Sequence, residues 1–148
     1  MQIWVDADAC PKAVKEVLFT VAERRKVQLI LVANSFLWVP NSSLIRTVQV
    51  AQGFNVADDH IAESIKPGDL VITADIPLAA EVIGKGCEVL TPRGDHFTVD
   101  NIQSTLAVRN LKEELRSAGM ITGGPPPFGP KEKQNFTNLL DRRLTAMM

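Results

Sequence analysis

The chain alternates short apolar runs with longer segments in which apolar residues recur at every third or fourth position. The short runs are typical of buried strands, and the longer segments are typical of helices with one face on a core. Strands are predicted at residues 3–5, 27–33, 47–51, 70–72 and 87–91. Helices are predicted at residues 12–25, 58–65, 78–85, 99–118 and 131–148. Alternation of strand and helix predicts a parallel sheet joined by right-handed crossovers.

The predicted fold class is α/β: a single three-layer domain over residues 1–148, with a parallel sheet in the order 3-2-1-4-5. The size of the chain fits one domain. In that order the first and fourth strands are neighbours at the point where the winding of the sheet reverses. Residues 120–148 add a proline-rich strap and a last helix, which we expect to pack on the core or on a second subunit.

The sequence also gives predictions for four shorter features of the chain. Residues 36–38 are expected to pack against the sheet rather than to stack on bases, and residues 40–43 are compatible with the start of a short helix. Asp58 or Asp59 is expected to cap the helix that follows. The long helix is expected to bury its apolar stripe, which consists of Ile102, Leu106, Ala107, Leu111, Leu115 and Ala118.

Acidic residues follow two of the predicted strands directly. Asp6 and Asp8 come after the first strand and Asp75 comes after the fourth, and in both places a proline then leads into a helix. Because these strands are neighbours at the switch point, the three acids are expected in one crevice at the carboxyl edge of the sheet, where α/β folds bind ligands. Asn34 follows the second strand and is expected at the same edge.

A helix cap would explain Asp8 without any chemistry. It would leave Asp6 without a role at the end of a buried strand, so we favour a metal or phosphate site. One of Asp58 and Asp59 is not needed as a cap, and it adds a fourth carboxylate. Four carboxylates in one cleft repel each other, and bound Mg²⁺ or Mn²⁺, as one or two ions, would remove that cost. Such sites usually act on phosphate esters.

Composition and net charge limit the classes of protein to which this chain can belong. Hydrophobic residues make up 45% of the chain, the net charge is −1, and no apolar run is long enough to span a bilayer. We expect a cytoplasmic protein that does not bind membranes, and we do not expect a general nucleic-acid coat. Lys66, Arg93 and Arg109 are candidates to contact a phosphate locally.

Five segments resemble the YaiI/YqxD family of small bacterial proteins: VDADACP at 5–11, Ala33 with Asn34, GDLVITADIPLA at 68–79, PRG at 92–94 and GGPPPF at 123–128. That family is similar to PIN-like and NYN-type domains, which are Mg²⁺- or Mn²⁺-dependent nucleases. The resemblance implies that Asp6, Asp75 and Asp59 (or Asp58) ligate the metal. Asp8 is extra to that pattern, as is Asn34.

Other readings stay open. A haloacid-dehalogenase-like phosphatase also starts with two acids after its first strand, but Asp58 and Asp59 precede Asp75, which is the wrong order. A cysteine phosphatase based on Cys10 lacks an arginine at the required spacing. Zinc is disfavoured because His60 and His96 are isolated. A non-catalytic module that binds nucleic acid or a nucleotide is the third class.

The sequence thus predicts a metal-dependent nuclease that acts on RNA or DNA, as a monomer or homodimer. Of these two substrates, RNA is the more expected. The expected catalytic residues are Asp6, Asp8, Asp59 and Asp75, and the expected metal ligands are Asp6, Asp59 and Asp75. The expected substrate or phosphate contacts are Asn34, Thr73, Lys66, Arg93 and Arg109.

Overall fold

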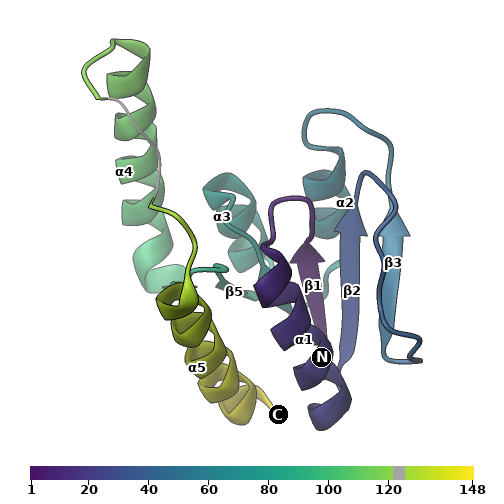
Figure 1. The fold of residues 1–148 in the computed structure, drawn as a ribbon. Helices are drawn as coiled ribbons and strands as arrows, with labels where there is room; N and C mark the ends of the chain where they lie inside the picture. The colour runs from purple at the N-terminus through teal and green to yellow at the C-terminus, as the bar shows by residue number, and fades with distance from the viewer. Residues whose placement is uncertain (122–125) are drawn as a thin grey trace.

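The computed structural model describes residues 1–121 and 126–148, and it shows one sheet with helices on both of its faces (Figure 1). The strands are β1 (Gln2–Asp6), β2 (Gln28–Ala33), β3 (Ile45–Gln49), β4 (Leu70–Ile72), β5 (Glu88–Leu90) and β6 (His96–Phe97). The helices are α1 (Lys12–Arg25), α2 (Val56–Ser64), α3 (Ile76–Gly84), α4 (Val99–Ser117) and α5 (Pro130–Met147).

The sheet has the order β3-β2-β1-β4-β5-β6, which confirms the predicted order of the first five strands. These five are parallel, and β1 pairs with both β2 and β4. The two-residue strand β6 was not predicted. It pairs antiparallel with β5, after a turn in which the Thr91 N–H donates to the Asp95 carbonyl at 2.9 Å.

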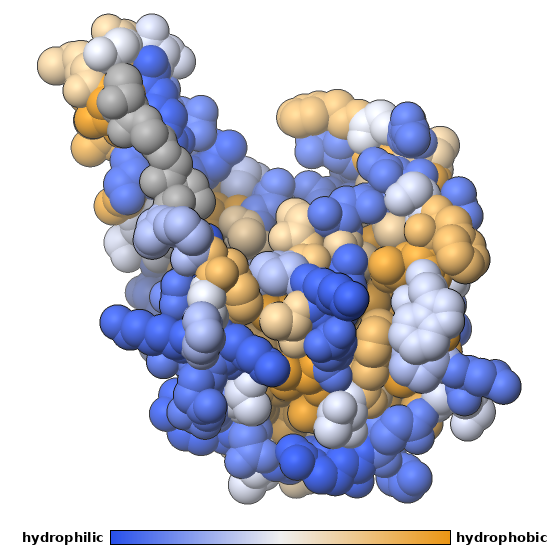
Figure 2. All heavy atoms as spheres, viewed as in Figure 1, coloured by the Kyte–Doolittle hydropathy of each residue, from blue (hydrophilic) through white to orange (hydrophobic). Residues whose placement is uncertain are grey.

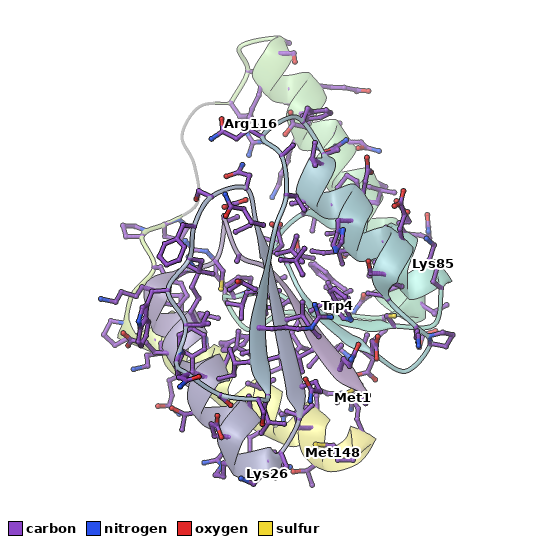
Figure 3. The ribbon with its side chains drawn as sticks, turned by 90° about the vertical axis from the view of Figure 1, so that its right-hand side faces the viewer. Met1, Trp4, Lys26, Lys85, Arg116 and Met148 are labelled. Carbon is purple, nitrogen blue, oxygen red and sulfur yellow. The ribbon has the colours of Figure 1, made fainter. Side chains whose placement is uncertain are left out.

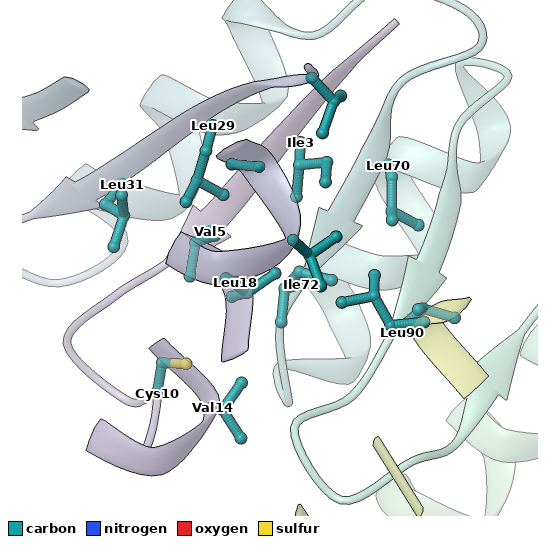
Figure 4. Close-up of a cluster of buried hydrophobic side chains, with 14 of the residues drawn as sticks. Ile3, Val5, Cys10, Val14, Leu18, Leu29, Leu31, Leu70, Ile72 and Leu90 are labelled. Atoms are coloured by element: carbon teal, nitrogen blue, oxygen red, sulfur yellow. The ribbon is translucent and has the colours of Figure 1, made fainter. Parts of the chain in front are cut away.

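Side chains of the central strands point alternately to two helical layers. Ile3 and Val5 of β1 face α1 and α5, while Trp4 between them faces α2 and α3. Figure 4 shows the first of these layers, in which β1, β2, β4 and β5 cover the apolar face of α1. In a sequence, parallel strands that are buried on both faces appear as continuous apolar runs. The central strands were predicted from this pattern.

The α5 helix lies against α1 and buries Phe136, Leu139, Leu140 and Leu144 in the first layer. Arg143 of α5 also holds Glu88 of β5 through two hydrogen bonds of 2.5 and 3.0 Å. The last helix therefore packs on the core. Residues 122–125 of the predicted strap lie outside the described residues.

The predicted burial of the α4 stripe was wrong beyond its first turn. Ile102 is buried, but Leu111 is 55% exposed because α4 leaves the sheet and extends away from the other helices (Figures 1 and 2). Of the three residues 36–38 that were predicted to pack against the sheet, Leu37 packs against the core, whereas Phe36 and Trp38 are 82% and 69% exposed.

Two further predictions differ from the structure. Residues 40–43 form no helix, and β3 begins two residues early, where Ile45 pairs with Leu29. None of the helices in the described residues combines the length and the apolar character needed to cross a membrane.

A substitution at Gly94 tests how α5 packs on the sheet. Its φ is +95°, and a Cβ there would lie 2.8 Å from the Asn135 Cβ and 2.9 Å from the Asn135 carbonyl carbon. We expect Gly94→Ala to lower the free energy of unfolding by about 3 kcal/mol, through backbone strain and overlap with α5. Gly68→Ala is the control in urea denaturation: φ is +92° there without any atom within 4 Å, so about 1 kcal/mol is expected. Equal losses would show that the close approach to α5 is unimportant.

Candidate functional site

One hydroxyl group connects the acids that end β1 and follow β4. Thr73 is buried, and its Oγ1 donates to the Asp6 Oδ2 at 3.1 Å and accepts from the Asp75 N–H at 3.0 Å. The hydroxyl thus uses its one donor on Asp6 and links the two acids, and a contact of Thr73 with a phosphate stays a prediction. Sequence reasoning missed this role, although a small polar residue between a buried strand and an acid is a signal for it.

Asp75 is the N-cap of α3, since its Oδ1 accepts from the Leu78 N–H at 2.8 Å. Its second oxygen has no such partner in the described part of the chain. Asp8 does not cap α1, which begins after Pro11 without a side-chain cap. Its Oδ2 instead accepts from the Asn34 N–H at 2.9 Å, which brings the end of β2 to the first strand, as expected.

Neither Asp58 nor Asp59 caps α2, which corrects the predicted cap. The helix starts earlier, after Asn55 in a left-handed conformation, and both acids lie in its first turn. Asp58 is half-buried and faces Asp75 and Asp6, whereas Asp59 is exposed. The signal for this difference was in the sequence: the buried residues Ile61 and Ala62 follow Asp58 by three and four positions, so they share its helix face.

The acids raise each other's affinity for protons. Burial, together with the negative charges of Asp75 and Asp6 and a hydrogen bond with Asp75, raises the pKa of Asp58 to about 7. Burial also raises the pKa of Asp6, against the hydrogen bond from Thr73, and Asp75 and Asp8 add to the rise. Like charges in one cleft disfavour ionisation, so a proton or a bound cation relieves the repulsion among these acids.

Two open hollows meet at Asp58. One, of about 160 Å³, is lined by Asp6, Asp8, Asn34 and the first turn of α2. The other, of about 200 Å³, is lined by Asp58, Asp59, Asp75, Phe54 and Arg109, among others. Within the described residues, the N–H groups of Ala57 and Asp58 have no acceptor, so the start of α2 offers donors beside the acids.

The donor set suits a hard divalent cation, because it consists of carboxylate oxygens. As the side chains stand, however, no three His, Cys, Asp or Glu residues of the described chain converge closely enough to hold an ion. Asp58 shares one hollow with Asp75 and the other with Asp6. These residues therefore have the oxygen donors that a hard cation prefers, but in the described chain they are not arranged around an ion.

The predicted basic residues separate in space. Arg109 lines the hollow with Asp58 and Asp75. Arg93 lies at the same edge but holds the strap, since it donates to the Pro126 carbonyl at 2.5 Å and lies 5.9 Å from the Phe128 ring. Lys66 precedes β4, where its N–H bonds to Asp69 at the amino edge of the sheet, so the fold does not bring Lys66 to the acids.

The alternative chemistries find little support here. Burial raises the pKa of the Cys10 thiol to about 12, with Lys15 opposing the rise, so the reactive thiolate is disfavoured. His96 lies 3.6 Å from Glu88, on the far side of β5, and His60 lies against Trp4. Neither histidine lines the two acidic hollows.

Comparison with known proteins gives one consistent result. The family model described as "Uncharacterized BCR, YaiI/YqxD family" matches residues 4–146. A UPF0178 protein of Maridesulfovibrio salexigens is 60% identical over 100% of this chain and 98% of its own length. UPF0178 proteins of Alkalilimnicola ehrlichii (99% of both chains) and Hahella chejuensis (97% of this chain, 96% of its own) are each 56% identical. No solved structure matches the chain.

The raised pKa of Asp58 predicts a pH-dependent stability of the metal-free protein. An aspartate in the unfolded chain has a pKa of about 3.9. Between about pH 4 and pH 7 the folded state therefore binds more protons than the unfolded state, and the free energy of unfolding falls as the pH rises. Asp58→Asn should stabilise the protein at about pH 8 by roughly 1 kcal/mol, after a discount for solvent screening, and should do so less at about pH 5.

Urea denaturation in EDTA at both pH values measures this difference. Glu23→Gln, an exposed carboxylate on α1, is the charge-matched control and should change stability little at either pH. A loss of stability in Asp58→Asn at about pH 8 would mean that the Asp58 charge is stabilising in the folded state.

Proposed function

The chain belongs to the YaiI/YqxD family, and for this member we propose the hydrolysis of phosphodiester bonds in nucleic acid, with one or two Mg²⁺ or Mn²⁺ ions. The observation that carries the proposal is the convergence of Asp6, Asp58 and Asp75 at the carboxyl edge of the sheet. The Thr73 hydroxyl links Asp6 to the Asp75 N–H, and Asp58 shares one hollow with Asp75 and the other with Asp6. Clustering acids in this way costs stability in the metal-free protein, and a function that uses a cation accounts for that cost.

Each residue has a defined task in this proposal. Asp6, Asp58 and Asp75 would hold the ion, with the exposed Asp59 at the rim of the same hollow as an alternative ligand. Asp8 would orient water. The N–H groups of Ala57 and Asp58, together with Arg109, would bind the oxygens of the phosphate. A bound ion would supply an activated water and stabilise the leaving oxygen.

The phosphatase reading fits the geometry less well. That chemistry needs a lysine beside the nucleophile, and in the described part of the chain no lysine lines either acidic hollow. The binding-module reading leaves the pairing of Asp58 with Asp75 unexplained, because repulsion of a polyanion by unscreened acids would weaken binding. A preference for RNA over DNA stays a prediction from the family resemblance.

Metal binding is expected to stabilise the protein. A ligand that binds only the folded state at about 100 times its Kd adds about 2.7 kcal/mol, which corresponds to a rise in Tm of ~5–10 °C for a chain of this length. Mn²⁺ and Mg²⁺ should each produce this rise in differential scanning fluorimetry, and Asp75→Asn should abolish it. Asparagine keeps the cap of α3, so the variant should fold. An unchanged Tm at millimolar Mn²⁺ would argue against the site.

Activity is tested with labelled single-stranded RNA and DNA of the same sequence. With Mn²⁺ the protein should cleave, EDTA should stop cleavage, and Asp6→Asn or Asp75→Asn should lower the rate by at least ~100-fold. Because the ligands of one ion act as a unit, the double variant should lose little more than either single variant.

Glu23→Gln is again the control, and it should cleave like the unmodified protein. Cleavage that survives both aspartate substitutions would point to a contaminating nuclease. Hydrolysis of a small phosphomonoester, with nucleic acid left intact, would favour the phosphatase instead.

A further inference from the structure

The helix α4 carries a row of cations that begins at the acidic site. We call α4 with residues 118–121 the α4 arm. Arg109, Lys112 and Arg116 line an open hollow of about 430 Å³ whose floor includes Ile76, the residue after Asp75. Arg109 also lines the acidic hollow, so the two hollows adjoin at this side chain. Figure 2 shows the arm standing apart from the rest of the molecule, with a broad notch between them.

The spacing of these cations suits a chain of phosphates. Intervals of three and four residues place them on one face of α4, and the row from Arg109 to Arg116 is about 10 Å long, the length of about three nucleotides in a stacked strand. Arg116 also pairs with Glu113 at 3.1 Å, but on an exposed helix this contact is weak. Within the described residues Lys112 has no charged partner. In Figure 3 Arg116 lies at the end of the molecule opposite to Lys26.

A bare aromatic ring lies on the other side of the acids. Phe54 precedes α2, lines the hollow that holds Asp58, Asp75 and Arg109, and is 93% exposed. Single exposed hydrophobic residues are common on protein surfaces. What distinguishes Phe54 is that it lines the same hollow as Asp58, Asp75 and Arg109. Exposed aromatic rings beside a basic groove are the usual platform for an unpaired base.

We propose that the α4 arm and Phe54 together form the binding track for a single-stranded polynucleotide. Arg109, Lys112 and Arg116 would hold three successive phosphates on one side of the scissile bond, and Phe54 would stack on a base beside it. A duplex would not offer a free base face to Phe54. This inference rests on the proposed hydrolysis, which defines the position of the scissile bond. Binding of a polynucleotide to the track does not require cleavage, so it can be tested separately.

Binding is measured by fluorescence anisotropy with a labelled oligonucleotide of about 12 nucleotides, in EDTA, at several salt concentrations. The triple variant Arg109→Gln/Lys112→Gln/Arg116→Gln should lower affinity at least ~10-fold at low salt and reduce the slope of log affinity against log salt by about 2. Phe54→Ala should weaken binding about 10-fold without changing the slope, and Phe54→Trp should restore it. A hairpin without single-stranded ends should bind less tightly than the open strand.

Two matched controls separate the track from general effects of charge and of exposed rings. Arg24→Gln/Lys26→Gln/Arg142→Gln removes the same charge from exposed positions on and beside α1 and on α5, and it should leave affinity and slope unchanged. Trp38→Ala removes an exposed ring that lies against Phe19 of α1, on the other face of the sheet, and it should also bind normally.

Equal losses in the two triple variants would overturn the track, and so would unchanged binding in both Phe54→Ala and the α4 variant. These outcomes leave metal-dependent cleavage intact if it is observed. If the α4 and Phe54 variants lose binding as expected but the unmodified protein cleaves nothing with Mn²⁺, the track stands and the proposed hydrolysis fails.

Discussion

The pairing of β1 with β4 is the constraint on which the rest of the structure depends, and an aspartate secures it at each end. At the amino edge the buried Asp69 accepts hydrogen bonds from the Gln2 N–H, the Trp4 indole and the Lys66 N–H, at 2.9, 3.2 and 3.0 Å. At the carboxyl edge Asp6 is held by Thr73. A slip of one residue would turn every side chain of β1 to the opposite face and would separate Asp6 from Asp75. The same two contacts therefore fix the fold and assemble the candidate site.

The two aspartates sit in opposite electrostatic settings. Asp69 is surrounded by donors, which compensate its burial. Asp6 receives one donor and faces other acids, so burial and its neighbours raise its pKa. The amino edge is thus a structural end of the sheet, and the carboxyl edge keeps electrostatic strain that a ligand can relieve. This division agrees with the general placement of binding sites in open α/β sheets.

Sequence patterns were sufficient for the features that depend on burial along a strand. The apolar runs gave the order of the first five strands, and the positions of Asp6, Asp8, Asn34 and Asp75 followed from it. The rest depends on where an element ends relative to its neighbours. The exposure of Leu111 arises because α4 continues past the sheet, and Asp58 faces the site because α2 starts at Val56. The first fact is not encoded in local periodicity, whereas the second agrees with the spacing of Ile61 and Ala62 from Asp58. Lys66 was misplaced because charge alone does not specify an edge of the sheet.

The chain leaves the sheet at Thr98 and returns to it at Phe128. The two ends of this excursion are anchored at the same place. Phe97 lies just before this segment and Phe128 at its end, and both line the same hollow. Arg93 also holds the returning segment, because it donates a hydrogen bond to the Pro126 carbonyl. Residues 103–121 contain no fully buried side chain, so this part of the α4 arm adds little to the core. Insertions or deletions of whole helical turns would change the reach of the molecule while leaving its base undisturbed. The fold thus separates a base whose shape is fixed by packing from an arm whose far end, beyond Arg116, is free to be resized.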